Sequence, residues 1–160
     1  MIGARLLAVS VAALSLAAPV RAADACRGTL SGMVKGAFDC TARIVTLGEG
    51  KGAFEIRPAG PIDGVPAYQP GAFEIALPPR PGTYGLDALG MGKASVAADG
   101  GAFYSATKTT GQRGEVTLVL RSVKPDPEAA GTWIVHGTYR ARLIPAGAGK
   151  EGDVVVEASF

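Results

Sequence analysis

The chain has few of the residues on which most active sites depend. Its 160 residues include one histidine, two cysteines and one tryptophan, and aromatic residues make up 6%. A zinc site uses three or four His or Cys ligands, and a Ser-His-Asp triad needs its histidine beside a nucleophile. Neither a Gly-x-Ser-x-Gly sequence nor a phosphate loop nor a dinucleotide fingerprint occurs. The sequence therefore predicts no catalytic residues, no metal site and no cofactor, and we expect a protein that is not an enzyme.

Long segments without glycine or proline are also missing. The chain holds 23 Gly and 11 Pro, and after residue 22 the longest stretch free of both is 37–47. Each interior glycine costs a helix about 1 kcal/mol and each proline about 3 kcal/mol. Strands of about 5–6 residues fit between these breaks. Helices are thus disfavoured, and we expect an all-β domain.

Apolar and polar residues alternate in several segments, as in strands with one buried face. The pattern occurs at 38–44, 54–56, 73–77, 115–121, 133–143 and 154–160. With turn signals between them, they predict an antiparallel Greek-key β-sandwich or a small soluble β-barrel of about seven to nine strands. No substantial helix is expected after the leader. The segment 57–71 holds four prolines, and we expect a long surface connection there.

The first 22 residues are typical of a cleavable secretory signal peptide. A basic start ending at Arg5 precedes the uncharged run 6–18, and small residues lie around Ala22. A helix of that run rises about 20 Å, less than the roughly 30 Å of a bilayer core. We therefore expect a signal peptide at 1–22, a single domain at 23–160, and export to the periplasm or the extracellular space.

Removal of the leader changes the net charge of the chain that folds. Arg5 and Arg21 lie in the leader, so 14 of the 16 Lys and Arg residues remain against 14 Asp and Glu. A nucleic-acid-binding domain keeps a basic surplus on its folded part. This balance argues against nucleic acid as a partner.

Cys26 and Cys40 are the two cysteines, and in an exported protein such a pair predicts a disulfide. The spacing is too long for a Cys-x-x-Cys redox motif. Lipidation of Cys26 is the alternative, but Asp24 does not suit a lipobox, and Cys40 would then be unpaired.

Polar residues on the expected strand 133–143 form the candidate binding face: His136, Arg140 and Arg142 share one side, which Arg43 or Arg121 would join from a neighbouring strand. Such a basic stripe suits an anionic glycan, a lipid head group or an acidic envelope protein. Exposed strands also carry charge simply for solubility.

Carboxylates offer the remaining routes to chemistry. Glu55 and Glu74 occupy equivalent places in two copies of Gly-Ala-Phe-Glu-Ile, and glycosidases use carboxylate pairs about 5–10 Å apart. The ordinary interpretation is an outward glutamate between two inward apolar residues. Calcium would find oxygen ligands at Asp126/Glu128 or Glu151/Asp153, but two carboxylates are too few to predict a site.

Two further motifs bear on the fold. Gly-Ala-Phe recurs at 36–38, 52–54, 71–73 and 101–103, at irregular spacing, and we interpret it as a device that leaves a turn and places a phenylalanine in the core. Tyr84 follows Pro81-Gly82, which resembles the tyrosine corner of Greek-key sandwiches. A tyrosine that merely starts a strand is the alternative.

Three hypotheses of function follow. The first is an exported, non-catalytic binding or structural envelope domain. The second is a small outer-membrane β-barrel, because Val154, Val156, Ala158 and a final Phe160 resemble the closing strand of such barrels. The scarcity of aromatic residues disfavours it, since membrane barrels carry two aromatic girdles. The third is an enzyme whose site is assembled only in space. We expect the first.

Overall fold

The computed structural model describes residues 26–109, 113–147 and 152–160, so the expected signal peptide lies outside the described residues. No helix occurs in these ranges, as predicted, and the described part of the chain has no helical segment long and apolar enough to cross a bilayer. It forms ten strands, one more than the expected maximum. They are β1 (Cys26–Gly32), β2 (Gly36–Gly48), β3 (Lys51–Pro58), β4 (Ala67–Ala76), β5 (Gly82–Gly85), β6 (Gly92–Ala97), β7 (Phe103–Thr107), β8 (Glu115–Pro125), β9 (Thr132–Pro145) and β10 (Val154–Ser159).

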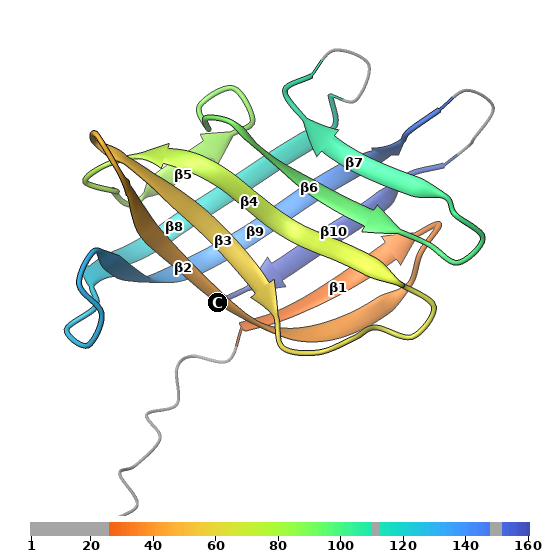
Figure 1. Cartoon of the computed structure of the whole chain (residues 1–160), viewed down its shortest axis with the longest axis horizontal. Helices are drawn as coiled ribbons and strands as arrows, with labels where there is room; N and C mark the ends of the chain where they lie inside the picture. Colours follow the sequence, from red (N-terminus) through yellow and green to blue (C-terminus); the bar gives the residue numbers. More distant parts are fainter. Residues whose placement is uncertain (1–25, 110–112, 148–151) are drawn as a thin grey trace, which may run out of the picture.

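The sheet closes on itself (Figure 1). Its order is β10-β1-β2-β3-β4-β6-β7-β9-β8-β5, and β10 also pairs with β9. Eight strands thereby form an antiparallel barrel, with β8 and β5 added beside it. The barrel, rather than the sandwich, is the architecture observed. Most sheet neighbours are also chain neighbours, because short turns join antiparallel strands.

Strand β9 connects the parts of this sheet. One edge pairs with β10 and, past the end of β10, with β2. The other edge pairs with β8 and, at Ile144 and Pro145, with β7. The extra strand β5 pairs with β8 and ends the sheet. With only four residues it offers few unpaired backbone groups to another chain.

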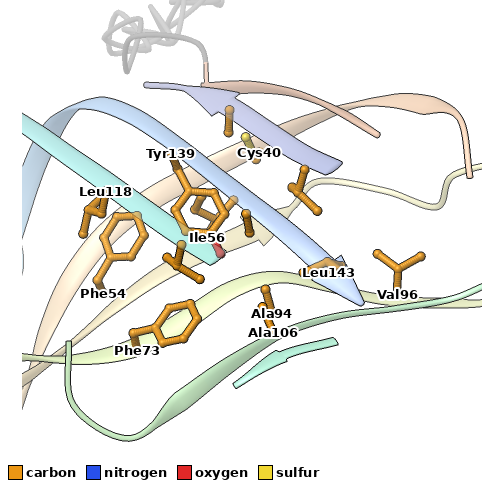
Figure 2. Packing of buried hydrophobic residues seen from close by; sticks show 14 of the residues in the cluster. Cys40, Phe54, Ile56, Phe73, Ala94, Val96, Ala106, Leu118, Tyr139 and Leu143 are labelled. Atoms are coloured by element: carbon orange, nitrogen blue, oxygen red, sulfur yellow. The ribbon is translucent and has the colours of Figure 1, made fainter. Parts of the chain in front are cut away.

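The predicted strand faces are confirmed, and the apolar faces point inward. Figure 2 shows side chains from β3, β4, β8 and β9 meeting inside the barrel. Phe54, Phe73, Leu118 and Tyr139 are each at most 2% exposed. Trp133 is partly buried and packs against the hydrophobic core to which they belong. Eight-stranded barrels are about wide enough for their own side chains to fill. The interior of this barrel is therefore its hydrophobic core.

The two copies of Gly-Ala-Phe-Glu-Ile pair with each other. They lie on β3 and β4, with Phe54 opposite Phe73 at the centre. Gly52 faces Ile75, and Gly71 faces Ile56. The space beside Gly52 is filled by Leu77 and Ile44, and the space beside Gly71 is filled by Tyr139. Three of the four Gly-Ala-Phe phenylalanines are buried, as interpreted from the sequence; Phe103 is 38% exposed.

The prediction that 57–71 is entirely a connection is wrong at both ends. β3 extends to Pro58 and β4 begins at Ala67. Pro70 is tolerated within β4 because the register shifts between Gln69 and Ala72, and a bulge does not need every N–H of the strand. The turn between the strands is not purely a surface feature either, because Ile62 and Val65 are buried and cover one end of the core.

Tyr84 makes the hydrogen bond expected of a tyrosine corner: its hydroxyl donates to the carbonyl of Arg80 at 2.7 Å. The β5–β6 connection that follows folds back on β4. There Glu74 accepts from Gly90 and donates to the carbonyl of Met91, both at 2.8 Å. This places Leu89 in the core.

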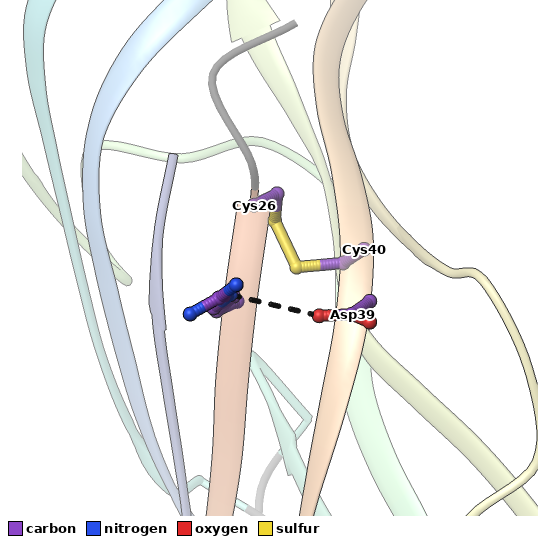
Figure 3. The surroundings of a disulfide bond; sticks show 4 residues. Cys26, Asp39 and Cys40 are labelled. Carbon is purple, nitrogen blue, oxygen red and sulfur yellow. Dashed lines mark ion pairs between the residues drawn. A yellow bond between two sulfur atoms is a disulfide. The ribbon is translucent and has the colours of Figure 1, made fainter. Parts of the chain in front are cut away.

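The predicted disulfide joins Cys26 to Cys40 (Figure 3). The two residues are direct partners in the β1–β2 ladder, with their Cα atoms 4.8 Å apart. They are 3% and 7% exposed, so the bond belongs to the core. It fixes the first described strand to the barrel.

Removing this bond is expected to destabilise the domain. Closing a loop of this size contributes roughly 3 kcal/mol in the chain-entropy model. Denaturant unfolding of the oxidised protein and of a C26S/C40S variant measures the difference. An equal free energy of unfolding for the two would contradict a stabilising role.

Candidate functional site

The candidate binding face lies on the outside of the barrel. His136, Arg140 and Arg142 point outward from β9, on the face opposite the buried Val135, Tyr139 and Leu143. In the ladder, His136 faces Ser122 of β8. The structure thus places all three residues on one outer strand face.

Carboxylates from neighbouring strands interrupt the basic stripe. Arg140 Nε lies 3.3 Å from Glu157 Oε1 on β10. Arg142 donates from Nε to Asp153 Oδ2 at 2.6 Å and lies 3.3 Å from Glu115 Oε1 on β8. The hydrogen bond that Arg142 donates to Asp153, with the charges of Asp153 and Glu115, raises the pKa of Arg142. The face is therefore a row of cross-strand ion pairs rather than a continuous positive surface.

The two arginines expected to join the face lie on neighbouring strands at its His136 end. Arg43 is on β2, level with Ile134, and its Nε is 3.6 Å from Glu55 Oε2. Arg121 lies at a register shift in β8, between the partners of Gly137 and His136. The Arg140 end of the face carries a hollow that neither arginine lines.

A hollow of about 600 Å³ covers the outer wall where β8, β9, β10 and β1 lie side by side. Its outward side chains are mostly short and hydroxylated, with two arginines and one glutamate. They are Arg27, Thr29, Thr117, Thr138, Arg140, Glu157 and Ser159. Of the three predicted residues, only Arg140 contributes to it.

The strand register explains the shape of the hollow. One row across the strands runs from Thr117 through Arg140 and Glu157 to Thr29. The next runs from Thr138 through Ser159 to Arg27. Threonine and serine are shorter than the charged side chains, so they form the floor.

Two ion pairs accompany this floor. Arg140 and Glu157 lie within the first row, between Thr117 and Thr29, with 66% and 57% of their side chains exposed. Arg27 and Asp39 lie at the end of the second row, with Arg27 Nε 3.8 Å from Asp39 Oδ1 and both side chains 79% exposed (Figure 3). A second hollow of about 270 Å³ shares Arg27 and Thr29 and extends over β2. The two hollows therefore adjoin at β1.

The Tyr139 hydroxyl is a polar group that the sequence analysis missed. It lies inside the core, fully buried, with no hydrogen-bond partner among the described residues. A Cβ on Gly71 would lie 2.7 Å from it, so the glycine leaves room for the oxygen. Burial raises the pKa of Tyr139, because an ionised phenolate would have no water around it. A lone tyrosine among inward apolar residues was the available signal.

The carboxylates considered for catalysis lie outside the hollow. Glu55 and Glu74 each face an alanine across the β3–β4 ladder. Glu55 accepts from Arg57 Nε at 2.8 Å, and Glu74 lies 3.8 Å from Lys51 Nζ. Each glutamate therefore has its own cationic partner on the outer wall.

The carboxylate pairs considered for calcium have other contacts. Asp126 accepts from the backbone N–H of Glu128 at 2.9 Å, which caps a turn. Asp153 is the partner of Arg142, and Glu151 lies outside the described residues. Across 26–109, 113–147 and 152–160, no three His, Cys, Asp or Glu side chains gather as a metal site would require.

Fold and site together define a small, disulfide-linked antiparallel barrel with a filled core and a polar hollow on its outer wall. No protein-family model, curated protein or solved structure matches the chain.

Replacing Tyr139 with phenylalanine is expected to stabilise the domain by about 1 kcal/mol or more, since a buried hydroxyl without a partner costs about 1–3 kcal/mol. Tyr84→Phe is the matched control, because it removes a hydroxyl that does have a partner, and it should cost about 0.5–1.5 kcal/mol. Urea unfolding at neutral pH measures both. A Tyr139→Phe variant as destabilised as Tyr84→Phe would contradict the structure.

The free energy of unfolding of the Tyr139→Phe variant is expected to fall less steeply at high pH than that of the unmodified protein. Above about pH 10 the unfolded chain loses the Tyr139 proton while the folded chain retains it, so the free energy of unfolding falls by roughly 1.4 kcal/mol per pH unit from this group. Below that pH both states hold the proton, and the group contributes no slope. Unfolding curves between pH 9 and pH 11.5 should show a shallower decline for Tyr139→Phe. Parallel declines would refute the assignment.

Proposed function

We propose that this protein is an exported, non-catalytic domain that binds its partner on the outer wall of the barrel. The observation that carries the proposal is the distribution of side chains across the wall. Apolar residues fill the interior, and charged residues stand outside. The hollows lined by described residues are formed by neighbouring strands: β8, β9, β10 and β1 in one, β1 and β2 in another, and β3 and β4 in a third.

This distribution of apolar and charged side chains favours the exported domain over an outer-membrane β-barrel. A membrane barrel presents an apolar band to lipid and a polar interior. Here Val154, Val156 and Ala158 of β10 point inward and are buried. The Phe160 ring packs 5.7 Å from that of Phe54 inside the barrel. The residues that resemble a membrane closing strand thus serve the core.

Ion pairs on the outside support the same proposal. Three ion pairs occupy wall positions that lipid would cover in a membrane barrel: Arg27–Asp39, Arg140–Glu157 and Arg142–Glu115. Charged side chains at the middle of a bilayer cost several kcal/mol each. Charged side chains at these positions are therefore better suited to contact with water than with lipid.

The disulfide supports export. Disulfides form and persist in oxidising compartments such as the periplasm and are rare in the cytosol. Cys26 and Cys40 are buried partners in the first ladder, so folding and oxidation are coupled. Because Cys26 is bonded to Cys40, the structure also favours the disulfide over lipidation of Cys26.

The hollow supports a binding role over catalysis. It is open to solvent on a wide face, and its single glutamate, Glu157, is paired with Arg140. General acid–base catalysis needs a titrating group within hydrogen-bond reach of a substrate proton. Threonines, a serine and two arginines suit recognition better than proton transfer.

Fractionation of a bacterium expressing the full chain tests the proposal. The protein is expected in the osmotic-shock fluid, with the intact mass of residues 23–160 less two hydrogens. A C26S/C40S variant is the control for the lost hydrogens. Recovery from the outer membrane with heat-dependent gel mobility would establish the membrane barrel instead, and an added lipid mass would establish a lipoprotein.

A further inference from the structure

We propose that the hollow over β8, β9, β10 and β1 binds an acidic oligosaccharide. Arg27 and Arg140 would hold carboxylate groups of the sugar, and the hydroxylated floor would bind its hydroxyl groups. This inference rests on the proposed binding function and names its class of ligand.

The floor supplies the hydrogen-bonding groups that a sugar needs. Thr29, Thr117, Thr138 and Ser159 come from four strands and point to the same side. Each hydroxyl donates one hydrogen bond and accepts up to two. None of the four is bonded to another side chain or to a backbone group in the described part of the chain. They are therefore available to a ligand without breaking a bond within the protein.

The arginines supply positive charge at two separate places in the hollow. Arg140 is on β9 and Arg27 on β1, with β10 between them. Arg140 is level with Thr29, two residues from Arg27 along β1. Two ladder steps of about 4.8 Å and this offset of about 6.8 Å set the Cα atoms of the arginines roughly 12 Å apart. The site therefore suits an extended ligand with more than one negative group.

The ion pairs of these arginines leave most of their donors unused. Each pair has one contact through Nε, at 3.8 Å for Arg27 and 3.3 Å for Arg140. A guanidinium carries five N–H donors in a planar fork that matches a carboxylate. Exposed ion pairs are weak, so a ligand carboxylate competes readily with Asp39 and Glu157.

The same hollow is unsuited to a lipid or to a protein hot spot. Both bury large apolar groups against their partner. The exposed large hydrophobic residues of the described chain are Met33, Leu47, Met91, Phe103 and Ile134, and none of them lines the hollow. The Tyr139 ring beneath the floor is buried in the core. Hydroxyls and charge without exposed rings fit a hydroxylated, negatively charged ligand.

Titration with two matched sugars tests the proposal on the purified protein. A tetramer of galacturonic acid carries carboxylates that a tetramer of galactose lacks. Backbone amide shifts in NMR report the site and the dissociation constant. The acidic tetramer is expected to shift Thr29, Thr138 and Ser159, and higher salt should weaken its binding. The neutral tetramer should bind at least tenfold more weakly.

Charge variants distinguish the hollow from general attraction. R27A/R140A is expected to weaken binding at least tenfold, and R57A/R80A, with the same change in net charge outside the hollow, should leave it unchanged. E157Q removes the competing carboxylate and should strengthen binding. R27K/R140K keeps the charge without the fork, and its intermediate affinity provides the test if the alanine variant does not fold.

Four results would overturn the inference. In the titrations, they are an absence of amide shifts with the acidic tetramer, shifts at residues away from the hollow, and equal affinity for both sugars. Among the variants, the contradicting result is that R57A/R80A weakens binding as much as R27A/R140A does. A protein recovered oxidised from the shock fluid that ignores the acidic sugar refutes only the ligand class. Recovery from the outer membrane refutes the proposed function, whichever sugar binds.

Discussion

The contact of Phe54 with Tyr139 across the barrel interior is the interaction on which the rest of the structure depends. The ring centres are 6.0 Å apart, and Phe73 lies opposite Phe54 on the neighbouring strand β4. Because Phe54 comes from β3 and Tyr139 from β9, strands that are not neighbours in the sheet, their contact joins separate parts of the barrel wall. Burial of aromatic side chains supplies much of the energy of a small core. Apolar side chains therefore occupy the interior of the described barrel, and the charged groups of its described ion pairs lie on the outer wall.

The outer wall shows how a chain of balanced charge arranges its ions. Arginines and carboxylates occupy neighbouring strands, and each pair spans a ladder: Arg27 with Asp39, Arg140 with Glu157, and Arg43 with Glu55. Directly opposed unlike charges add a small preference for the correct register. The same pairing keeps the wall polar without creating a strong field of one sign. Recognition on such a wall depends on local geometry more than on long-range attraction.

The sequence was sufficient to predict those features that depend on neighbouring residues. Alternation over 115–121 and 133–143 predicted which side chains are buried, because the period of a strand is two. The disulfide followed from the presence of two cysteines.

In contrast, the sequence did not predict the partners of Arg140 and Arg142. These partners come from β10, β8 and the residue before β10, and pairing between distant strands leaves no local signal. The hollow was missed for the same reason, since β1, β8, β9 and β10 each contribute only one or two outward side chains to it. Pro70 was misleading because a bulge removed the usual penalty.

The pairing of the two Gly-Ala-Phe-Glu-Ile segments has a consequence for how the chain finds its fold. In antiparallel alignment the motif is complementary to itself, with glycine opposite isoleucine and phenylalanine opposite phenylalanine. A slip of two residues would keep the buried face but place each ring against a glycine or an isoleucine, so the motif specifies its own alignment. Identical segments of two molecules possess the same complementarity. In the finished barrel β3 is paired on both edges, with β2 and with β4, and closure thus confines this self-recognition to a single chain.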